Sequence, residues 1–180
     1  GGMLPLGERT YVMGVLNVTP DSFSDGGEHF PEKRKALQRC EAMEREGADI
    51  IDIGGESTRP GASPVSAGEE MRRVIPVIRA AARRARVPIS VDTSKSEVAR
   101  EAIRNGASIV NDVTALRGDP RMAGVIARAG AGVILMHMRG SPGTMQRDPS
   151  YEDLMGEVVA DLMLSIKNAL AAGIPEGNII

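Results

Sequence analysis

The chain has 180 residues, of which 42% are apolar and 26% charged, a composition typical of one ordinary globular domain. Its formal net charge of −2 gives no reason to expect a nucleic acid or an anionic membrane as partner. No apolar run approaches the roughly 20 residues of a membrane span, so no membrane partner is predicted. The single cysteine, Cys40, cannot form an internal disulfide and favours a cytoplasmic location. It shares a predicted helix face with Leu37 and Met43, which indicates a small core residue.

Five short apolar segments predict strands, and a sixth strand is expected to begin at the end of the chain. The five lie at about 11–16, 50–53, 89–91, 109–112 and 132–136, and the sixth begins at 178–180. Three of them follow a glycine, Gly47, Gly106 or Gly130, which suits the left-handed conformation at the end of a helix. The segments alternate little between apolar and polar residues, as is typical of a parallel sheet covered on both faces.

The segments between these strands have helical periodicity. Ser66 and Glu69 predict a capping box at the start of one helix, in which Pro76 is expected to cause a kink or a split. Ser94 and Glu97 predict a second capping box. A later helix is predicted to end at Gly173 and to bury the apolar stripe Leu154, Val158, Leu162, Ile166 and Leu170.

Alternation of strands and helices without hairpin signals predicts a parallel α/β fold. No G-x-G-x-x-G segment follows a strand, which argues against a dinucleotide-binding open sheet and favours a (β/α)8 TIM barrel. A complete barrel of this kind typically needs about 250 residues. We therefore expect residues 1–180 to be the N-terminal portion of a single barrel domain, with five strand-helix units and strands six to eight missing or truncated. Such a portion alone is expected to be inactive and poorly folded.

Polar residues stand at the ends of the predicted strands, at Asn17, Asp52, Asp92, Asn111 and Asp112. In a barrel the active site lies at the carboxyl ends of the strands. Burying carboxylates and amides there is costly unless they are paired or bind a ligand. Asp52 taken alone is equally compatible with a cap on the next helix, but five such residues favour a shared polar pocket.

Two loops that follow the first two strands carry residue types that bind anions or metals. The loop at 18–27 holds hydroxyls and carboxylates, among them Asp25, and also Phe23, for which a core role is not expected. The loop at 54–61 holds Arg59, whose planar guanidinium suits phosphate. Each loop alone is compatible with a solvated surface loop, but the two at successive strand ends favour a binding site.

The chain resembles the dihydropteroate synthases in four segments: MGVLNVTPDSFSDGG at 13–27, STRPG at 57–61, SVDT at 90–93 and NDV at 111–113. The resemblance spans the whole chain. It implies a transferase that condenses 6-hydroxymethyl-7,8-dihydropterin pyrophosphate with 4-aminobenzoate, giving 7,8-dihydropteroate and pyrophosphate in folate biosynthesis. It also implies Mg2+ as cofactor, sulfonamides as competitors of the aminobenzoate, and a homodimer.

The resemblance also implies roles for individual residues. Asn17 would be a ligand of the metal and of the pyrophosphate, and Arg59 would hold the departing pyrophosphate. Asp25, favoured over Asp21, would stabilise a pterin cation, and Thr58 would contact substrate.

The remaining implied contacts are with the two organic substrates. Asp92 and Asn111 would hydrogen-bond the guanidine-like edge of the pterin. The apolar contacts would be Val113 and Met136 in the pterin slot, for which core packing is an equal alternative, and Phe23 and Pro60 around the aminobenzoate.

Some features of the family are not among these 180 residues: the Asp-Pro-Gly-type segment of the sixth strand, the lysine of the seventh and the Arg-x-His of the eighth. Two other functions therefore stay open. A pterin-binding methyltransferase domain shares this barrel, but the intact TPDSFSD loop argues against it. A non-catalytic pterin-binding paralogue would keep the pocket without turnover. His29 and His137, with no nearby cysteine, make a weak zinc signature, and packing is favoured for both.

Overall fold

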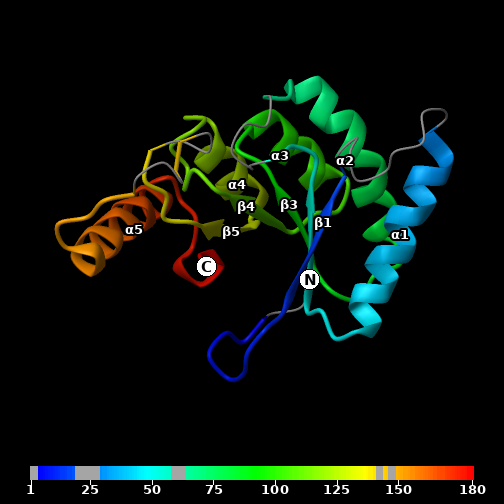
Figure 1. The fold of residues 1–180 in the computed structure, drawn as a ribbon, viewed down its shortest axis with the longest axis horizontal. Helices are drawn as coiled ribbons and strands as arrows, with labels where there is room; N and C mark the ends of the chain where they lie inside the picture. Colours follow the sequence, from blue (N-terminus) through cyan, green and yellow to red (C-terminus); the bar gives the residue numbers. More distant parts are fainter. Residues whose placement is uncertain (1–3, 19–28, 58–63, 141–143, 146–148) are drawn as a thin grey trace.

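The sheet in the computed structural model is parallel and takes its strands in chain order. The structure describes residues 4–18, 29–57, 64–140, 144–145 and 149–180. The strands are β1 (Met13–Asn17), β2 (Ile50–Gly54), β3 (Ile89–Asp92), β4 (Ile109–Asp112) and β5 (Gly132–Leu135), hydrogen-bonded in the order β1-β2-β3-β4-β5 (Figure 1). This order has no point of reversal, unlike that of a doubly wound open sheet, and it is the order of strands in a (β/α)8 barrel. The predicted fold class is confirmed.

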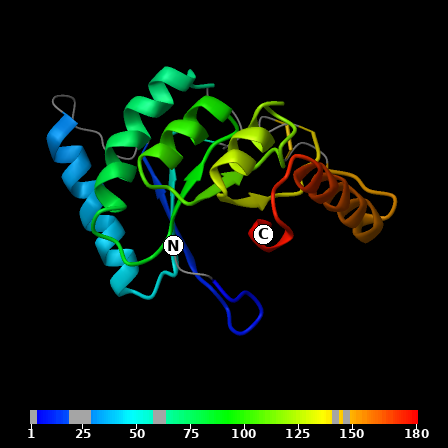
Figure 2. The same ribbon diagram turned by 180° about the vertical axis from the view of Figure 1, so that it is seen from behind.

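One helix follows each strand. The helices are α1 (His29–Arg45), α2 (Ala67–Ala81), α3 (Ser96–Arg104), α4 (Met122–Ala129) and α5 (Leu154–Ala171), followed by the short 3-10 helix η2 (Glu176–Asn178). Figures 1 and 2 show α1 to α4 in an arc along one side of the curved sheet, with α5 apart at the end of the arc, beyond β5. Among the described residues, no helix combines the length and the apolarity that crossing a membrane requires.

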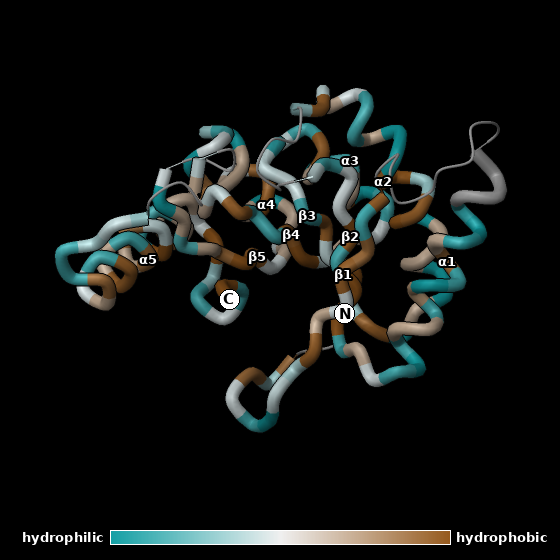
Figure 3. The backbone as a smooth tube through the Cα atoms, viewed as in Figure 1, coloured by the Kyte–Doolittle hydropathy of each residue, from teal (hydrophilic) through white to brown (hydrophobic). Residues whose placement is uncertain are grey.

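The core lies between the sheet and the arc of helices. One row of strand residues in register faces the helices, and its members are buried: Leu16, Ile53, Val91, Val110 and Val133. Figure 3 shows these strands as largely hydrophobic. From the helices, Val74 and Ile78 of α2 and Cys40 of α1 join the same core, which confirms the interpretation of Cys40. Full burial of such an aliphatic side chain contributes about 1.5–3 kcal/mol.

The local signals at the ends of the helices are largely confirmed. The predicted left-handed backbone occurs at all three glycines, with φ of +103° at Gly47, +110° at Gly106 and +64° at Gly130. Ser66 is the N-cap of α2, and its side chain accepts a hydrogen bond from the amide of Glu69. α2 runs unbroken from Ala67 to Ala81 with Pro76 inside it, so the expected split does not occur.

The predicted cap of α3 is wrong. α3 begins at Ser96, its N-cap is Lys95, and no side-chain hydrogen bond comes from that cap. Instead the amide of Ser96 donates to Asp119 Oδ2 at 3.1 Å, across from the loop that precedes α4. A carboxylate from the next strand-helix unit therefore replaces the local cap expected at Ser94.

The apolar stripe of α5 is only partly buried. Val158, Leu162 and Ile166 are half-buried, but Leu154 and Leu170 at the two ends of the stripe are 53% and 45% exposed. The fully buried residues of α5 are the small ones, Ser165 and Ala169. The period of the stripe was predicted correctly, and the depth of its burial was overestimated.

The predicted start of a sixth strand is confirmed, one residue later than expected. Ile179 forms a parallel bridge with Val133 of β5. The amide of Ile180 donates to Val133 O at 2.8 Å, and the amide of Leu135 donates to Ile180 O at 2.8 Å. Asn178 precedes this pairing, at the end of η2.

Candidate functional site

Four neighbouring positions at the carboxyl ends of the strands form a continuous row across the sheet. Asn17 pairs with Gly54, Gly54 with Asp92, and Asp92 with Asn111. Residues in register on parallel strands point to the same face. This face is opposite to the one that packs against the helices, because the buried row of the core lies one residue earlier on each strand. We call Asn17, Gly54, Asp92 and Asn111 the polar row.

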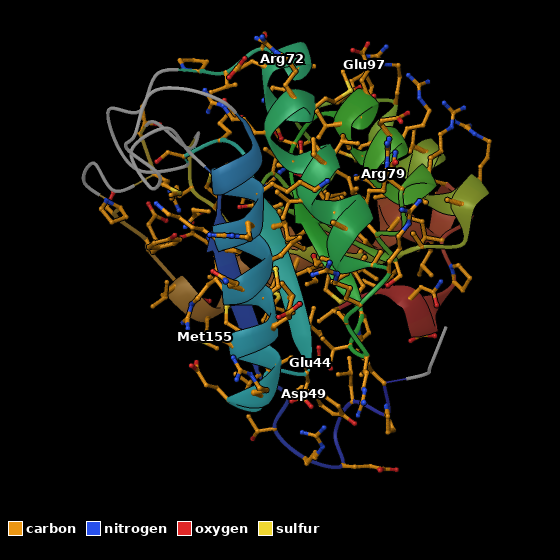
Figure 4. All side chains as sticks on the ribbon, turned by 90° about the vertical axis from the view of Figure 1, so that its right-hand side faces the viewer. Glu44, Asp49, Arg72, Arg79, Glu97 and Met155 are labelled. Carbon is orange, nitrogen blue, oxygen red and sulfur yellow. The ribbon has the colours of Figure 1, made fainter. Side chains whose placement is uncertain are left out.

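The polar row lies at the end of the molecule where the helices begin. Figure 4 labels Arg72 in the first half of α2 and Glu97 in the first turn of α3, which mark this end. Glu44 and Asp49, near the end of α1 and before β2, mark the opposite end. The sequence prediction that polar residues at successive strand ends meet is therefore confirmed for Asn17, Asp92 and Asn111.

Gly54 is flanked closely by the side chains of its two neighbours in the row. A Cβ added at Gly54 would lie 3.3 Å from Asp92 Oδ2 and 3.6 Å from Asn17 Oδ1. The side chains of Asp92 and Asn17 therefore lean toward Gly54 from either side, and a larger residue there would crowd Asp92. Among the described residues, none donates a hydrogen bond to the carboxylate of Asp92, although this side chain is largely buried.

The electrostatic surroundings of Asp92 are strongly acidic. Burial raises the pKa of Asp92, and the neighbouring carboxylates of Asp52, Glu70, Asp112 and Glu56 raise it further, to about 7. A ligand that brought N–H donors to Asp92 would favour its ionised form. An unpaired, largely buried carboxylate with a perturbed pKa among other polar groups is a typical feature of a binding site.

Asp52 lies one layer below the row and orients one of its members. The Nδ2 of Asn111 donates to Asp52 Oδ2 at 2.9 Å. Burial raises the pKa of Asp52, and the neighbouring Ser90 hydroxyl and the Asn111 amide oppose the rise. Asp52 Oδ1 and the Oγ of its register neighbour Ser90 are both buried, and neither makes a hydrogen bond of standard geometry in the described part of the chain. Asp52 thus belongs to the polar pocket, and the alternative that it caps a helix does not apply.

Asp112 does not belong to the pocket, contrary to the sequence prediction. It points to the opposite face from Asn111, because successive strand residues alternate between faces. Its Oδ1 accepts from the amide and the hydroxyl of Thr114 at 2.9 and 2.7 Å, and its Oδ2 accepts from the amide of Leu116 at 2.9 Å. These bonds hold a turn in which Ala115 and Leu116 have φ of 51° and 68°. Asp112 is a structural residue.

The other predicted substrate residues fall into two groups. Val113 and Met136 lie directly past the carboxyl ends of β4 and β5, and both are half-buried. Val113 follows Asn111 by two positions, and Met136 follows Ile134 by two positions. Asn111 and Ile134 are in register on the face of the sheet that points away from the helices. The remaining predicted residues lie outside the described part of the chain: Phe23, Asp25, Thr58, Arg59 and Pro60.

Asn17 is the one metal ligand that the sequence predicts, and it lies in the described part of the chain. Within the described ranges, no group of three or more His, Cys, Asp or Glu side chains is arranged to hold a metal ion. Asn17 offers one amide oxygen at the exposed end of the polar row. Mg2+ commonly takes one or two protein oxygens together with water and substrate phosphates, so a single oxygen here is compatible with it.

His137 is held by other side chains rather than poised for zinc. Its Nδ1 is 2.7 Å from Asp161 Oδ2 and its Nε2 is 3.0 Å from the hydroxyl of Tyr151. Arg117 pairs with the other oxygen of Asp161. This network supports the packing interpretation of His137, while the side chain of His29 is outside the described part.

Sequence reasoning missed a cluster beside the polar row, formed by Glu56, Glu70 and Lys95. Lys95 Nζ lies 2.5 Å from Glu56 Oε2 and 2.6 Å from Glu70 Oε2. One signal was available, because Glu70 stands four residues before Val74 on the apolar face of α2. A charged residue on a buried helix face needs a partner. We call these three residues the acid–lysine cluster.

Comparison with known proteins gives a consistent result. The family profile described as pterin binding enzyme matches residues 13–180. A dihydropteroate synthase of Bacillus subtilis is 52% identical over 173 residues, which cover 96% of this chain and 58% of the relative. Two solved dihydropteroate synthases superpose closely. That of Clostridium difficile, in the presence of pteroic acid, has a TM-score of 0.89 and 47% identity over 98% of this chain and 65% of its own. That of Xanthomonas albilineans, with 4-aminobenzoic acid, has a TM-score of 0.86 and 46% identity, and the match covers 96% of this chain and 60% of the other.

The chain therefore spans about three fifths of the length of these relatives. Its matched region includes every strand, every helix and the whole polar row. Sequence identity near one half over nearly the whole chain agrees with the barrel order of the strands and with the polar row at their carboxyl ends. The chain belongs to the family of pterin binding enzymes.

Proposed function

We propose that the protein condenses 6-hydroxymethyl-7,8-dihydropterin pyrophosphate with 4-aminobenzoate to give 7,8-dihydropteroate and pyrophosphate, a step of folate biosynthesis. The observation that carries the proposal is the carboxylate of Asp92. It is largely buried, unpaired among the described residues, and directly beside the backbone of Gly54. Such a group needs a ligand with N–H donors, and the guanidine-like edge of a pterin has them.

In this proposal the pterin binds along the polar row. Asp92 in its ionised form accepts from the pterin edge, and Asn111, oriented by Asp52, adds an amide contact. Val113 and Met136 at the ends of β4 and β5 supply apolar surface for the flat ring. Replacing Asp92 with an uncharged residue would remove the charge-assisted hydrogen bond to the pterin, which contributes about 1.5–3 kcal/mol.

The reaction is a substitution at the methylene carbon of the pterin. The bond from this carbon to the pyrophosphate oxygen breaks, and its electron pair leaves with the pyrophosphate. The amine nitrogen of 4-aminobenzoate forms the new bond and loses a proton. Negative charge therefore builds on the leaving group, and stabilising that charge is the main electrostatic task.

The groups proposed for that task come from the end of β1 and from the two sequence segments that follow β1 and β2. Asn17 would hold Mg2+ together with pyrophosphate oxygens, and the ion would supply charge neutralisation when bound. Arg59 would pair with the departing pyrophosphate. Thr58 would contact substrate, and Phe23 and Pro60 would surround the aminobenzoate ring.

A pterin cation forming at the methylene carbon would be stabilised by a carboxylate, and we assign this role to Asp25. An Asp25→Asn variant should lose most of its turnover, because an amide cannot balance the positive charge. Steady-state kinetics with saturating substrates measure this directly. Near-wild-type turnover of the variant would remove Asp25 from the mechanism.

Three further properties belong to the proposal. The lone Cys40 supports a cytoplasmic location. A homodimer and inhibition by sulfonamides competing with 4-aminobenzoate follow from the family resemblance. Sedimentation velocity tests for the homodimer. Inhibition kinetics at varied 4-aminobenzoate concentration test for competition by sulfonamides.

The proposal is tested by calorimetry of the full-length protein with the pterin pyrophosphate, with and without Mg2+, followed by addition of 4-aminobenzoate. Magnesium-dependent binding and then release of pyrophosphate support a synthase. Tight binding without release of pyrophosphate would instead indicate a non-catalytic pterin-binding protein. The absence of binding under both conditions would overturn the assignment of the polar row.

A further inference from the structure

The acid–lysine cluster joins three separate elements next to the polar row. Glu56 lies in the loop after β2, Glu70 lies on α2, and Lys95 is the N-cap residue of α3. Glu70 is 0% exposed, and its Oε1 has no hydrogen-bond partner among the described residues. Lys95 thus provides the charge that compensates a fully buried carboxylate. Removing one partner of such a pair leaves an uncompensated buried charge and destabilises the folded state.

The same cluster fixes the backbone that continues from β2. Glu56 Oε1 accepts from the amide of Val65 at 2.8 Å, so residue 56 is tied to the segment that leads into α2. Arg73 of α2 donates to Gly55 O at 2.9 Å. There is no spare room at Gly55, because an added Cβ would lie 2.7 Å from Val74 Cγ1.

This fixed segment is directly connected to the polar row. Gly54 is the last residue of β2 and lies between Asn17 and Asp92 in the row. Lys95 follows Asp92 by three residues, after a turn in which its amide donates to Thr93 Oγ1 at 3.2 Å. A bond between Lys95 and Glu56 therefore links the segments that directly follow β2 and β3, two residues after Gly54 and three after Asp92.

The charge on Lys95 is not switched near neutral pH. Partial burial lowers the pKa of Lys95, but its hydrogen bonds to Glu56 and Glu70 more than offset this, so the pKa is raised above the ordinary lysine value. The ammonium group therefore stays charged at neutral pH.

We propose that Lys95 is a positioning residue for substrate: by bonding Glu56 and Glu70 it holds Gly54 and Gly55 at the distance from Asp92 that the pterin requires. This inference rests on the proposed function for the identity of the ligand. The rival explanation is that the cluster only stabilises the packing of α2 and α3. The two differ in whether a folded protein without the bond still binds the pterin normally.

The test compares Lys95→Met, which keeps the length of the side chain without its charge, with Lys95→Arg, which keeps charge and donors. Lys167→Met, at an exposed position of α5, controls for the loss of one positive charge. The full-length variants are compared by hydrogen exchange at the amides of Gly55, Glu56 and Val65, and by the Kd for dihydropterin pyrophosphate. Exchange is measured without ligand, so its result does not depend on the proposed function.

We expect exchange at these amides to rise about tenfold in Lys95→Met and the Kd to weaken by about the same factor or more, since small displacements in a binding site have large effects. Lys95→Arg should recover most of both losses, and Lys167→Met should match the wild type. Pterin binding within twofold of wild type in folded Lys95→Met would overturn the proposal, as would unchanged exchange. Failure of the wild type to bind pterin would overturn the proposed function instead.

Should Lys95→Met fail to fold, Glu56→Gln provides the second variant. It keeps an acceptor for the amide of Val65 while weakening the bond to Lys95. We expect changes in the same direction, of about threefold to fivefold in both measurements. Values within twofold of wild type would contradict a positioning role for the cluster.

Discussion

At the end of β3, the carboxylate of Asp92 is surrounded by other acidic groups and has no hydrogen-bond donor among the described residues. Its pKa rises from 3.8 to about 7. The folded protein therefore holds this proton more tightly than the unfolded chain does. As the pH rises from about 4 to about 7, ionisation of Asp92 destabilises the folded state, and above this range the full penalty remains.

An Asp92→Asn substitution should remove this penalty. We expect the free energy of unfolding of the variant at pH 8 to exceed that of the wild type by on the order of 2–4 kcal/mol. This difference should shrink toward pH 4. Its Kd for the pterin should weaken by about 100-fold at pH 8, since a charge-assisted hydrogen bond is lost. Urea unfolding across this pH range and calorimetry measure the two effects. Equal stability of both proteins at every pH would show that Asp92 is not under electrostatic strain.

The residues of the site differ in how far sequence alone could assign them. Asn17, Asp92 and Asn111 are predictable because each is the last or next-to-last residue of a strand, and parallel strands end at the same edge. Asp112 was misplaced, although the alternation of faces along a strand separates it from Asn111 and could have excluded it. Lys95 was missed for another reason: its partners lie 39 and 25 residues away in sequence, and no local pattern reports such a contact.

At the scale of elements, Gly55, the residue after β2, packs closely against α2. A Cβ at this position would lie 2.7 Å from Val74 Cγ1 and 3.3 Å from the backbone oxygen of Glu70. Because one of these neighbours is backbone, the helix cannot relax by changing a rotamer. Glycine at position 55 is therefore required by packing against α2.

We expect Gly55→Ala to lower the free energy of unfolding by about 1–3 kcal/mol, as overpacking does in a close-packed core. Gly68→Ala is the matched control, because Gly68 lies in α2 and an added Cβ there meets nothing within 4 Å. The control should be neutral or stabilise by up to about 1 kcal/mol through helix propensity. Similar results for both variants would mean that β2 and α2 are less tightly packed than described.

α5 is attached to the rest of the fold by polar side-chain contacts as well as by a shallow apolar face. Its exposed apolar residues include Met155, Val159, Met163 and Leu164. Asp161 joins it to His137 after β5 and to Arg117 after β4.

An Asp161→Ala variant should therefore loosen α5 selectively. We expect hydrogen exchange in Leu154–Ala171 to accelerate at least about tenfold, while exchange in β2 and β3 stays unchanged. Asn168→Ala, at an exposed position of the same helix, serves as control and should leave exchange near the wild-type rate. Uniform acceleration across the sheet would instead show that α5 and the sheet unfold together.

The elements themselves were largely predictable, since short apolar runs and left-handed glycines are local signals. Gly47, Gly106 and Gly130 each end a helix or its following turn as expected. The cap of α3 was not predictable, because Asp119 reaches it from a different strand-helix unit. The burial of α5 was also beyond the sequence, since periodicity reports which face is apolar and not what covers it.

At the scale of the whole molecule, the curved sheet separates two tasks. Its outer face, Ile53, Val91, Val110 and Val133 among others, packs against the arc of helices and supplies the core. Its inner face carries the polar row at one end, where charged groups are held by the elements behind them. The site can therefore contain a destabilising group such as Asp92, because the stability of the fold comes from the other face.

Binding of the pterin by the polar row, in a condensation with 4-aminobenzoate, is tested by pyrophosphate release. The full-length protein is supplied with dihydropterin pyrophosphate, 4-aminobenzoate and Mg2+, in parallel for wild type and Asp92→Asn. We expect one pyrophosphate for each dihydropteroate formed, and a fall of about 100-fold in kcat/KM in the variant. Release of no pyrophosphate by the wild type would rule out the reaction, and equal kcat/KM in the two proteins would rule out pterin binding by Asp92.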